Sequence, residues 1–208
     1  MAYVEDGIAL KKEQIDDKKK TVFLIGDSIR MGYCETVKER LSDIANVTFP
    51  NENCRNSQYV LTSLRTWASL VDAQEVDAVL FNCGQWDVAH FEGDEYNLTD
   101  IRTYAHNIKR IILRIRGHFP NAKVYFATCS SMNPTGLVGR NPRTNAEVEA
   151  YNREACRVAM EEGVDICDIY GFTSALDASQ FVDYAHLTKP AFASLGIFVA
   201  SFLRERLK

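Results

Sequence analysis

Two short segments near opposite ends of the chain carry side chains suited to nucleophilic catalysis. Ser28 follows an apolar run and ends the sequence Gly26-Asp27-Ser28, where a tight turn before a helix would expose its hydroxyl. Asp183 and His186 stand three residues apart before the last apolar segment, so the carboxylate can hold the imidazole in one tautomer. Such a histidine can accept the serine proton and later return it to a leaving alkoxide. These residue types predict acyl transfer through a serine nucleophile.

Each segment alone has a simpler interpretation. Asp27 and Ser28 are both common helix N-caps, and an isolated Asp–x–x–His sequence is more often a capped helix start with a surface histidine. The chemical interpretation therefore depends on a fold that brings the two segments together.

Short apolar runs alternate with longer amphipathic segments from residue 21 onward. The apolar runs predict strands over 21–26, 46–50, 78–83, 123–129 and 164–170. The amphipathic segments predict helices over 31–44, 60–71, 100–116, 145–162 and 189–207. This alternation predicts an α/β fold, a flavodoxin-like three-layer α/β/α sandwich with a five-stranded parallel sheet. In such sheets ligands bind beyond the carboxyl ends of the strands, which is where both segments fall.

Composition indicates one globular domain. The chain has 208 residues, of which 46% are hydrophobic and 25% charged, and we expect a tail over 1–20 and a single domain over 21–208. A net charge of −4 offers no basic field for nucleic acid. The N-terminus lacks the apolar segment of a secretion signal and no window is apolar enough to span a membrane, so we expect a cytoplasmic protein without a membrane partner. Six cysteines without a CxxC motif or a Cys/His cluster predict free thiols and no metal site.

The ordered set of motifs resembles the SGNH hydrolases, also called the GDSL lipase/esterase family. The GDS at 26–28 and the DxxH at 183–186 are similar to the first and last motifs of that family. The segments 53–59 (NCRNSQY) and 82–87 (NCGQWD) stand where the family places its second and third blocks. The resemblance runs from Val22 to about Leu203, and it implies an SGNH-type hydrolase domain.

The resemblance implies a two-step ester hydrolysis that needs no metal or organic cofactor. Ser28 would attack the ester carbonyl and form an acyl-enzyme, and water activated by His186 would release the acid. Asp183 would orient His186. The implied partner is a small-molecule acyl ester.

The oxyanion hole of the family departs from its usual composition here. The family uses a block-two glycine N–H and a block-three asparagine side chain, where this chain has Cys54 and Trp86. We expect the backbone N–H groups of Ser28 and Cys54 and the carboxamide of Asn53 to be the oxyanion donors. The residues expected to border the substrate are Asp27, Gly84, Trp86 and Asp87.

A polar loop rich in glycine and proline, over 130–144, follows the fourth predicted strand on the catalytic edge of the sheet. Loops of this length in compact domains are usually functional or mobile, and this one is placed to shape the leaving-group pocket. Arg140 and Arg143 on the loop could contact an acidic or hydroxyl-rich substrate, but solvated loop charges are the simpler interpretation.

The sequence favours hydrolysis of a small polar acyl ester, with acetylated carbohydrate as the preferred substrate class. A lipid-type acylhydrolase or thioesterase is an alternative of the same class. A catalytically silent binding module is a second alternative, supported by the missing block-three asparagine. A flavodoxin-like nucleotide binder is disfavoured, because no glycine-rich phosphate loop follows the first strand. The acyl group and the oligomeric state are left open.

Overall fold

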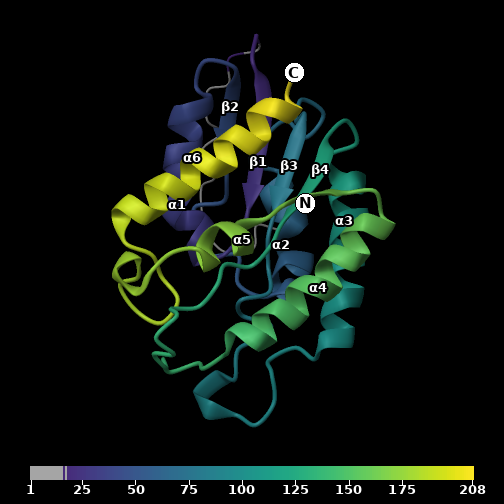
Figure 1. Ribbon diagram of the computed structural model, residues 1–208. Helices are drawn as coiled ribbons and strands as arrows, with labels where there is room; N and C mark the ends of the chain where they lie inside the picture. The colour runs from purple at the N-terminus through teal and green to yellow at the C-terminus, as the bar shows by residue number, and fades with distance from the viewer. Residues whose placement is uncertain (1–15, 17) are drawn as a thin grey trace.

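The computed structural model describes residue 16 and residues 18–208. Of the predicted tail over 1–20, residues 1–15 and 17 lie outside the described residues. The strands are β1 (Lys20–Ile25), β2 (Ala45–Thr48), β3 (Ala78–Phe81), β4 (Lys123–Ala127) and β5 (Asp165–Cys167). They form one parallel sheet in the order β2-β1-β3-β4-β5 (Figure 1). The order reverses between β1 and β3, which marks the carboxyl ends of these two strands as the expected site of ligand binding.

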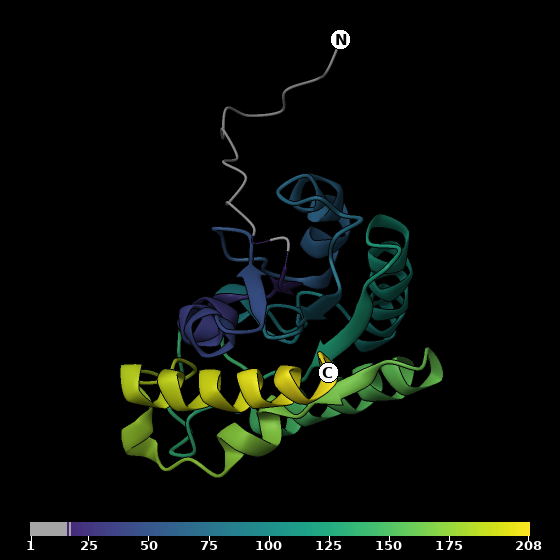
Figure 2. The ribbon, with the colours of Figure 1, turned by 90° about the horizontal axis from the view of Figure 1, so that it is seen from above.

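Helices cover both faces of the sheet. They are α1 (Ser28–Leu41), α2 (Ser57–Ala68), α3 (Ile101–His118), α4 (Asn145–Glu161), α5 (Ile169–Ser174) and α6 (Lys189–Arg206). Helices α1 and α6 lie on one side of the sheet, and α2 and α3 lie on the other (Figure 2). The short 3-10 helices η1 (Phe91–Gly93) and η2 (Ala178–Gln180) lie in connecting segments. No helix in the described part of the chain is long and apolar enough to cross a membrane.

The interior strand β1 shows why the strands of this sheet are continuous apolar runs in the sequence. Phe23 and Ile25 pack into the hydrophobic core beneath α2, α3 and α4, whereas Val22 and Leu24 pack into the core beneath α1 and α6. All four side chains are at most 1% exposed. A strand covered on both faces has no polar alternation, and this is typical of a doubly covered parallel sheet.

The predicted fold class is confirmed, but most of the predicted boundaries of strands and helices are wrong by one to three residues, and two of these differences have a clear physical cause. Helix α1 begins at Ser28 rather than residue 31, because the Asp27 carboxylate accepts a hydrogen bond from the Ile29 N–H at 2.9 Å and caps the helix. Strand β5 ends at Cys167 because Asp168 caps α5, a helix that the sequence analysis missed. A helix of only 6 residues is too short to show a clear periodic pattern.

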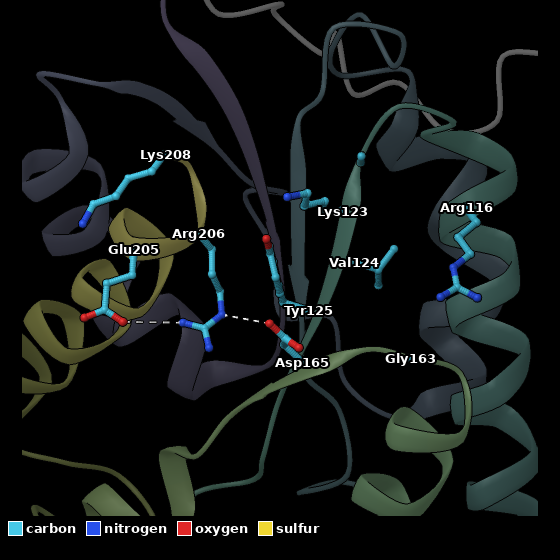
Figure 3. Close-up of a pocket in the computed structure, with 10 residues that line it drawn as sticks. Arg116, Lys123, Val124, Tyr125, Gly163, Asp165, Glu205, Arg206 and Lys208 are labelled. Carbon is cyan, nitrogen blue, oxygen red and sulfur yellow. Dashed lines mark hydrogen bonds and ion pairs between the residues drawn. The ribbon is translucent and has the colours of Figure 1, made fainter.

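A hollow of about 520 Å³ lies at the amino-terminal edge of the sheet, among the starts of β4 and β5 and the end of α6 (Figure 3). Arg206 lies there between two carboxylates, Asp165 at 3.2 Å and Glu205 at 3.8 Å. Ser28 follows the carboxyl end of β1, so this hollow lies at the opposite edge from the predicted catalytic residues.

The first and last helices pack at very close range. Gly196 of α6 faces α1, and a Cβ atom built there would lie 2.6 Å from the Thr36 Cβ and 3.0 Å from the Tyr33 carbonyl oxygen. Because a backbone atom is one of the two obstacles, a side-chain rotation cannot relieve the clash. Gly196 therefore sets the distance between the two helices.

Replacing Gly196 by alanine should lower the free energy of unfolding by about 1–2 kcal/mol, because the steric clash exceeds the gain in helix propensity. Gly117, at the end of α3, is a matched control, since a Cβ atom built there meets nothing within 4 Å. Gly117→Ala should raise the free energy of unfolding by about 0.5–1 kcal/mol. Urea unfolding of both variants checks the opposite signs, and a Gly196→Ala variant as stable as the parent would contradict the close packing.

Candidate active site

The structure brings Ser28, His186 and Asp183 together in one hydrogen-bonded chain. The Ser28 Oγ lies 2.9 Å from His186 Nε2, and His186 Nδ1 lies 2.8 Å from Asp183 Oδ2. Ser28 and His186 are 158 residues apart in the sequence. In this arrangement Nδ1–H donates to the carboxylate and the serine hydroxyl donates to Nε2, so the imidazole is held in the tautomer that can accept the serine proton.

The turn that carries Ser28 leaves no room for a side chain at Gly26. A Cβ atom there would lie 2.2 Å from the Asn82 Oδ1 and 2.6 Å from the Arg30 Cβ. Ser28 is the first residue of α1, directly after its N-cap Asp27. The N–H groups of a first helical turn have no carbonyl partner within the helix. The oxyanion role of the Ser28 N–H stays a prediction.

The turn that carries His186 is organised by Asp183. Its Oδ1 accepts hydrogen bonds from the N–H groups of Ala185 (2.8 Å) and His186 (2.7 Å), which leaves Oδ2 for the imidazole. Partial burial opposes ionisation of Asp183, but these hydrogen bonds outweigh it and lower the pKa of the carboxyl below its ordinary value. Asn133 also fixes this turn. Its side-chain amide donates to the Asp183 carbonyl oxygen at 3.1 Å, and its backbone N–H donates to the Tyr184 carbonyl oxygen at 2.9 Å.

A buried arginine fastens the Ser28 turn to the loop after β2. The Arg30 side chain is 1% exposed and donates to the carbonyl oxygens of Gly26, at 3.3 Å, and of Glu52. The Cys54 N–H also donates to the Gly26 carbonyl, at 3.1 Å. The predicted oxyanion role of Cys54 therefore needs correction, because its N–H already has a backbone acceptor.

Asn53 lies in this same loop after β2, and its carboxamide has a defined orientation. Its Oδ1 accepts a hydrogen bond from the Arg55 N–H at 2.9 Å, which directs the carboxamide NH₂ away from that contact. Arg55 has φ 52°, in the left-handed region that favours glycine, and its guanidinium lies 4.8 Å over the Tyr59 ring. The oxyanion role of Asn53 stays a prediction.

Two predicted substrate contacts after β3 are buried instead. The Asp87 carboxylate is 0% exposed and accepts hydrogen bonds from the Ser57 N–H (2.9 Å) and the Ser57 hydroxyl (2.5 Å), so it fastens the start of α2. Gly84 has φ 137°, and a Cβ atom there would lie 2.6 Å from the Cys129 Sγ. Both residues therefore shape the interior beneath the site and do not border the substrate.

Asp27 and Trp86 complete the predicted substrate contacts. Asp27 is 1% exposed and acts as the N-cap of α1, so its predicted contact with substrate is also corrected. Burial raises the pKa of the Asp27 carboxyl, against the hydrogen bond from Ile29 and the positive charge of Arg143. Trp86 is half-buried and packs against the Phe91 ring with 5.4 Å between centroids. Its role in binding stays a prediction.

Arg143 was predicted as a solvated loop charge, but the structure holds it against Gln85 and Tyr184, beside the turn that carries His186. The half-buried side chain donates from Nε to the Gln85 Oε1 at 2.7 Å and from Nη1 to the Asn141 carbonyl at 3.2 Å. The guanidinium lies 5.4 Å over the Tyr184 ring, next to Asp183. Desolvation lowers the pKa of Arg143, while Tyr184 and Asp27 act in the opposite direction.

A capping motif in the sequence indicates where Arg143 lies in the fold. Thr144 and Glu147 form a capping box at the start of α4, in which the Thr144 side chain accepts from the Glu147 N–H and the Glu147 carboxylate accepts from the Thr144 N–H. This motif places residue 143 directly before a helix that starts at the carboxyl edge of the sheet. Arg140 does match the prediction, since its side chain is 79% exposed and pairs with Glu92.

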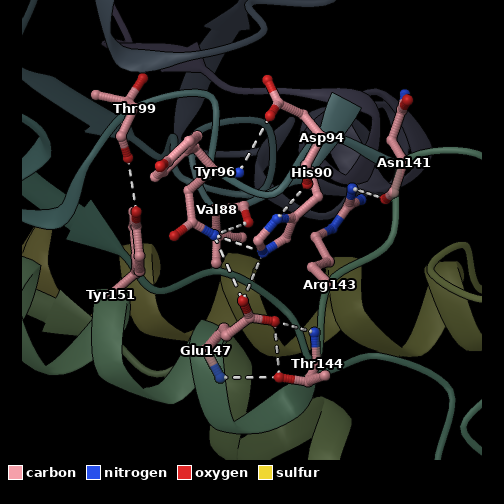
Figure 4. Close-up of polar contacts among 11 residues, drawn as sticks. Val88, His90, Asp94, Tyr96, Thr99, Asn141, Arg143, Thr144, Glu147 and Tyr151 are labelled. Atoms are coloured by element: carbon pink, nitrogen blue, oxygen red, sulfur yellow. Dashed lines mark hydrogen bonds and ion pairs between the residues drawn. The ribbon is translucent and has the colours of Figure 1, made fainter. Parts of the chain in front are cut away.

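A histidine–glutamate pair joins the first turn of α4 to the segment after β3 (Figure 4). His90 Nε2 lies 2.7 Å from the Glu147 Oε1, and His90 Nδ1 lies 2.9 Å from the Asp94 carbonyl oxygen. The His90 N–H also donates to the Pro142 carbonyl at 2.9 Å. His90 Nε2 also lies 3.1 Å from the Asn97 Nδ2. The imidazolium satisfies both oxygen acceptors, and the bond to Glu147 raises the pKa of His90.

The described residues include no group of three or more His, Cys, Asp or Glu side chains that could hold a metal ion. All six cysteines are free thiols, which confirms that prediction.

Comparison with known sequences identifies a family. Residues 24–190 match the GDSL-like lipase/acylhydrolase family. A search of curated proteins finds no significant match.

Several solved structures share the fold at low sequence identity. An acetyl xylan esterase superposes with a TM-score of 0.72 at 16% identity, over 88% of this chain and 99% of the other. A lipase/acylhydrolase from Enterococcus faecalis superposes with a TM-score of 0.72 at 18% identity, over 91% and 97% of the two chains. A carbohydrate acetylesterase from Sinorhizobium meliloti superposes with a TM-score of 0.67 at 13% identity, over 90% of this chain and 99% of the other.

His90→Gln should destabilise the protein more at about pH 5.5 than at about pH 8.5. A histidine whose pKa is raised in the folded protein makes its full contribution to stability at pH values below the ordinary pKa of 6.5. This contribution is lost as the pH rises through the pKa of the folded protein. We expect a loss of about 1 kcal/mol at the lower pH and less at the higher pH, measured by urea unfolding. His106→Gln, at an exposed position of α3, is the control. An equal loss at both pH values would show that the His90–Glu147 pair does not depend on the imidazolium.

Proposed function

This chain belongs to the GDSL-like lipase/acylhydrolase family, and we propose that it is a serine esterase that removes a small acyl group from a polar alcohol. The observation that carries the proposal is the hydrogen-bonded chain from Asp183 through His186 to the Ser28 hydroxyl. The preferred substrate class is an O-acetylated carbohydrate.

In the proposed mechanism the Ser28 Oγ attacks the ester carbonyl while His186 Nε2 accepts its proton. The tetrahedral oxyanion receives hydrogen bonds from the Ser28 N–H and the Asn53 carboxamide. His186 then protonates the leaving alkoxide, and an acyl group remains on Ser28. A water molecule that gives its proton to His186 attacks the carbonyl of this acyl-enzyme. The bond between the acyl group and the Ser28 Oγ then breaks, His186 returns the proton to Oγ, and the acid is released. Asp183 stabilises the imidazolium in both steps.

The preference for acetylated carbohydrate has two supports. Two of the structural neighbours are described as an acetyl xylan esterase and a carbohydrate acetylesterase. The hollow beside Arg143 has a volume of about 370 Å³, at the lower end of the usual range for small-molecule sites of about 300–1,000 Å³. Ser28 and His186 do not line it, but Asn133, which holds the turn that carries His186, does.

A lipid-type acylhydrolase is a second candidate, and one observation favours it. Leu137 and Val138, which line the same hollow, are 55% and 72% exposed and form an apolar rim that an acyl chain could contact. A neighbour from Enterococcus faecalis is described as a lipase/acylhydrolase.

Fluorophosphonate labelling should modify Ser28 in the native protein, and Ser28→Ala should lower ester hydrolysis by at least about 10³-fold, because the nucleophile is lost. Ser42→Ala, at the other end of α1, is the matched control and should retain both properties. Labelling that persists in Ser28→Ala, or hydrolysis that survives the substitution, would refute the assignment of the nucleophile. Absence of both in the native protein would favour the catalytically silent binding module.

The kcat/KM for nitrophenyl esters should be highest for acetyl and should fall by about 10-fold or more by octanoyl, because a small acyl pocket excludes the longer chain. Steady-state kinetics over a series of acyl lengths measures this. A maximum at long chains would favour the lipid-type acylhydrolase instead.

A further inference from the structure

Arg143 is a partly desolvated cation without a carboxylate against it. Its hydrogen bonds go to the neutral oxygens of Gln85 and Asn141, and no ion pair involving it occurs in residue 16 or residues 18–208. Within the described part of the chain, the more deeply buried Arg30 also lacks an acidic partner and donates to the backbone carbonyl oxygens of Gly26 and Glu52. Arg143 differs from Arg30 because it lines a hollow that a ligand can enter. Asp27 acts on Arg143 through space, but the Asp27 carboxylate caps α1 and makes no direct ion pair with the guanidinium.

The surroundings of Arg143 hold its position over the catalytic edge. Gln85, which accepts from its Nε, is in turn fixed because its amide donates to the Ser130 carbonyl at 2.6 Å. The Tyr184 ring lies against the guanidinium on one side, and Gly139 leaves space for this ring, since a Cβ there would lie 2.0 Å from it. Arg143 thereby contacts the segments after β3 and before α6, and it lines the 370 Å³ hollow.

A desolvated guanidinium is costly unless a charged group pairs with it, and it binds oxyanions through a planar fork of N–H donors. The acidic residue of the hollow, Glu147, is already bonded to His90 and Thr144. Neither Asp27 nor Glu147 makes an ion pair with Arg143, so the guanidinium is available to an anionic group of a ligand.

We propose that Arg143 is a specificity-determining residue that pairs with an oxyanion group on the alcohol portion of the ester. The substrate class is then an acylated sugar that carries a carboxylate or a phosphate, in place of a neutral sugar. This inference rests on the proposed esterase function for the reaction itself, but the anion contact can be measured without catalysis.

The test is calorimetric binding to Ser28→Ala protein, which separates recognition from turnover. The probes are methyl glucuronide, glucose 6-phosphate and methyl glucoside, which carry a carboxylate, a phosphate and no charge. One of the two anionic probes should bind about 10- to 100-fold more tightly than methyl glucoside, the range of a charge-assisted hydrogen-bonded pair. The probe that binds identifies which oxyanion the site accepts. In the otherwise native enzyme, kcat/KM for the acetylated forms should show the same preference.

Adding Arg143→Gln to the Ser28→Ala protein should abolish the preference for the anionic probe. Adding Arg143→Lys, which keeps the positive charge but lacks the planar fork of N–H donors, should retain part of the preference. Arg140→Gln is the matched control, because Arg140 lies on the same loop and is already paired with Glu92. Equal binding of charged and neutral probes, or the same loss in the Arg140 and Arg143 variants, would overturn the inference. An intact anion preference in a protein that hydrolyses no ester would instead refute the esterase function and leave the anion site standing.

Discussion

The hydrogen bond between the Ser28 hydroxyl and His186 Nε2 joins segments 158 residues apart, and the carboxyl edge of the sheet is organised to keep its two ends in place. A site of this kind must hold its groups to within about 0.5 Å of the productive geometry. One end is fixed because Asp27 caps α1 and Arg30 fastens the preceding turn to the loop after β2. The other end is fixed because Asp183 closes the turn around His186. Each anchor is a buried or partly buried polar contact, and such contacts tolerate little displacement.

The fold was predictable from the sequence because burial dominates its pattern. A strand such as β1, covered by helices on both faces, can only be a short apolar run between turns, and α3 carries its isoleucines on one side. The convergence of Ser28 and His186 was also predictable. Ser28 follows a strand and His186 precedes a helix, and in a parallel sheet both positions lie at the carboxyl edge. Capping residues set some of the boundaries that were wrong, since the side chain of Asp27 starts α1 three residues before the predicted position.

Side-chain direction within a loop was not predictable, and it decided the rest of the site. The sequence places Asp87 on the catalytic edge, but only the Ser57 hydroxyl and N–H turn its carboxylate inward. Cys54 likewise lies at the expected place, yet its N–H points to the Gly26 carbonyl. Arg143 shows the opposite error, because an arginine in a polar loop resembles a solvated charge until Gln85 and Tyr184 are seen to enclose it. These orientations arise from contacts between residues remote in the sequence, which periodicity does not encode.

The close approach of α1 and α6 across Gly196 has a consequence for biogenesis. Ser28 stands at the head of one of these helices and His186 just before the other, so the hydrogen bond between them cannot form until residue 186 has been synthesised. Until α6 docks, the face of α1 that later meets α6 leaves apolar side chains uncovered. The order of synthesis therefore makes the Ser28–His186 contact a late event in folding.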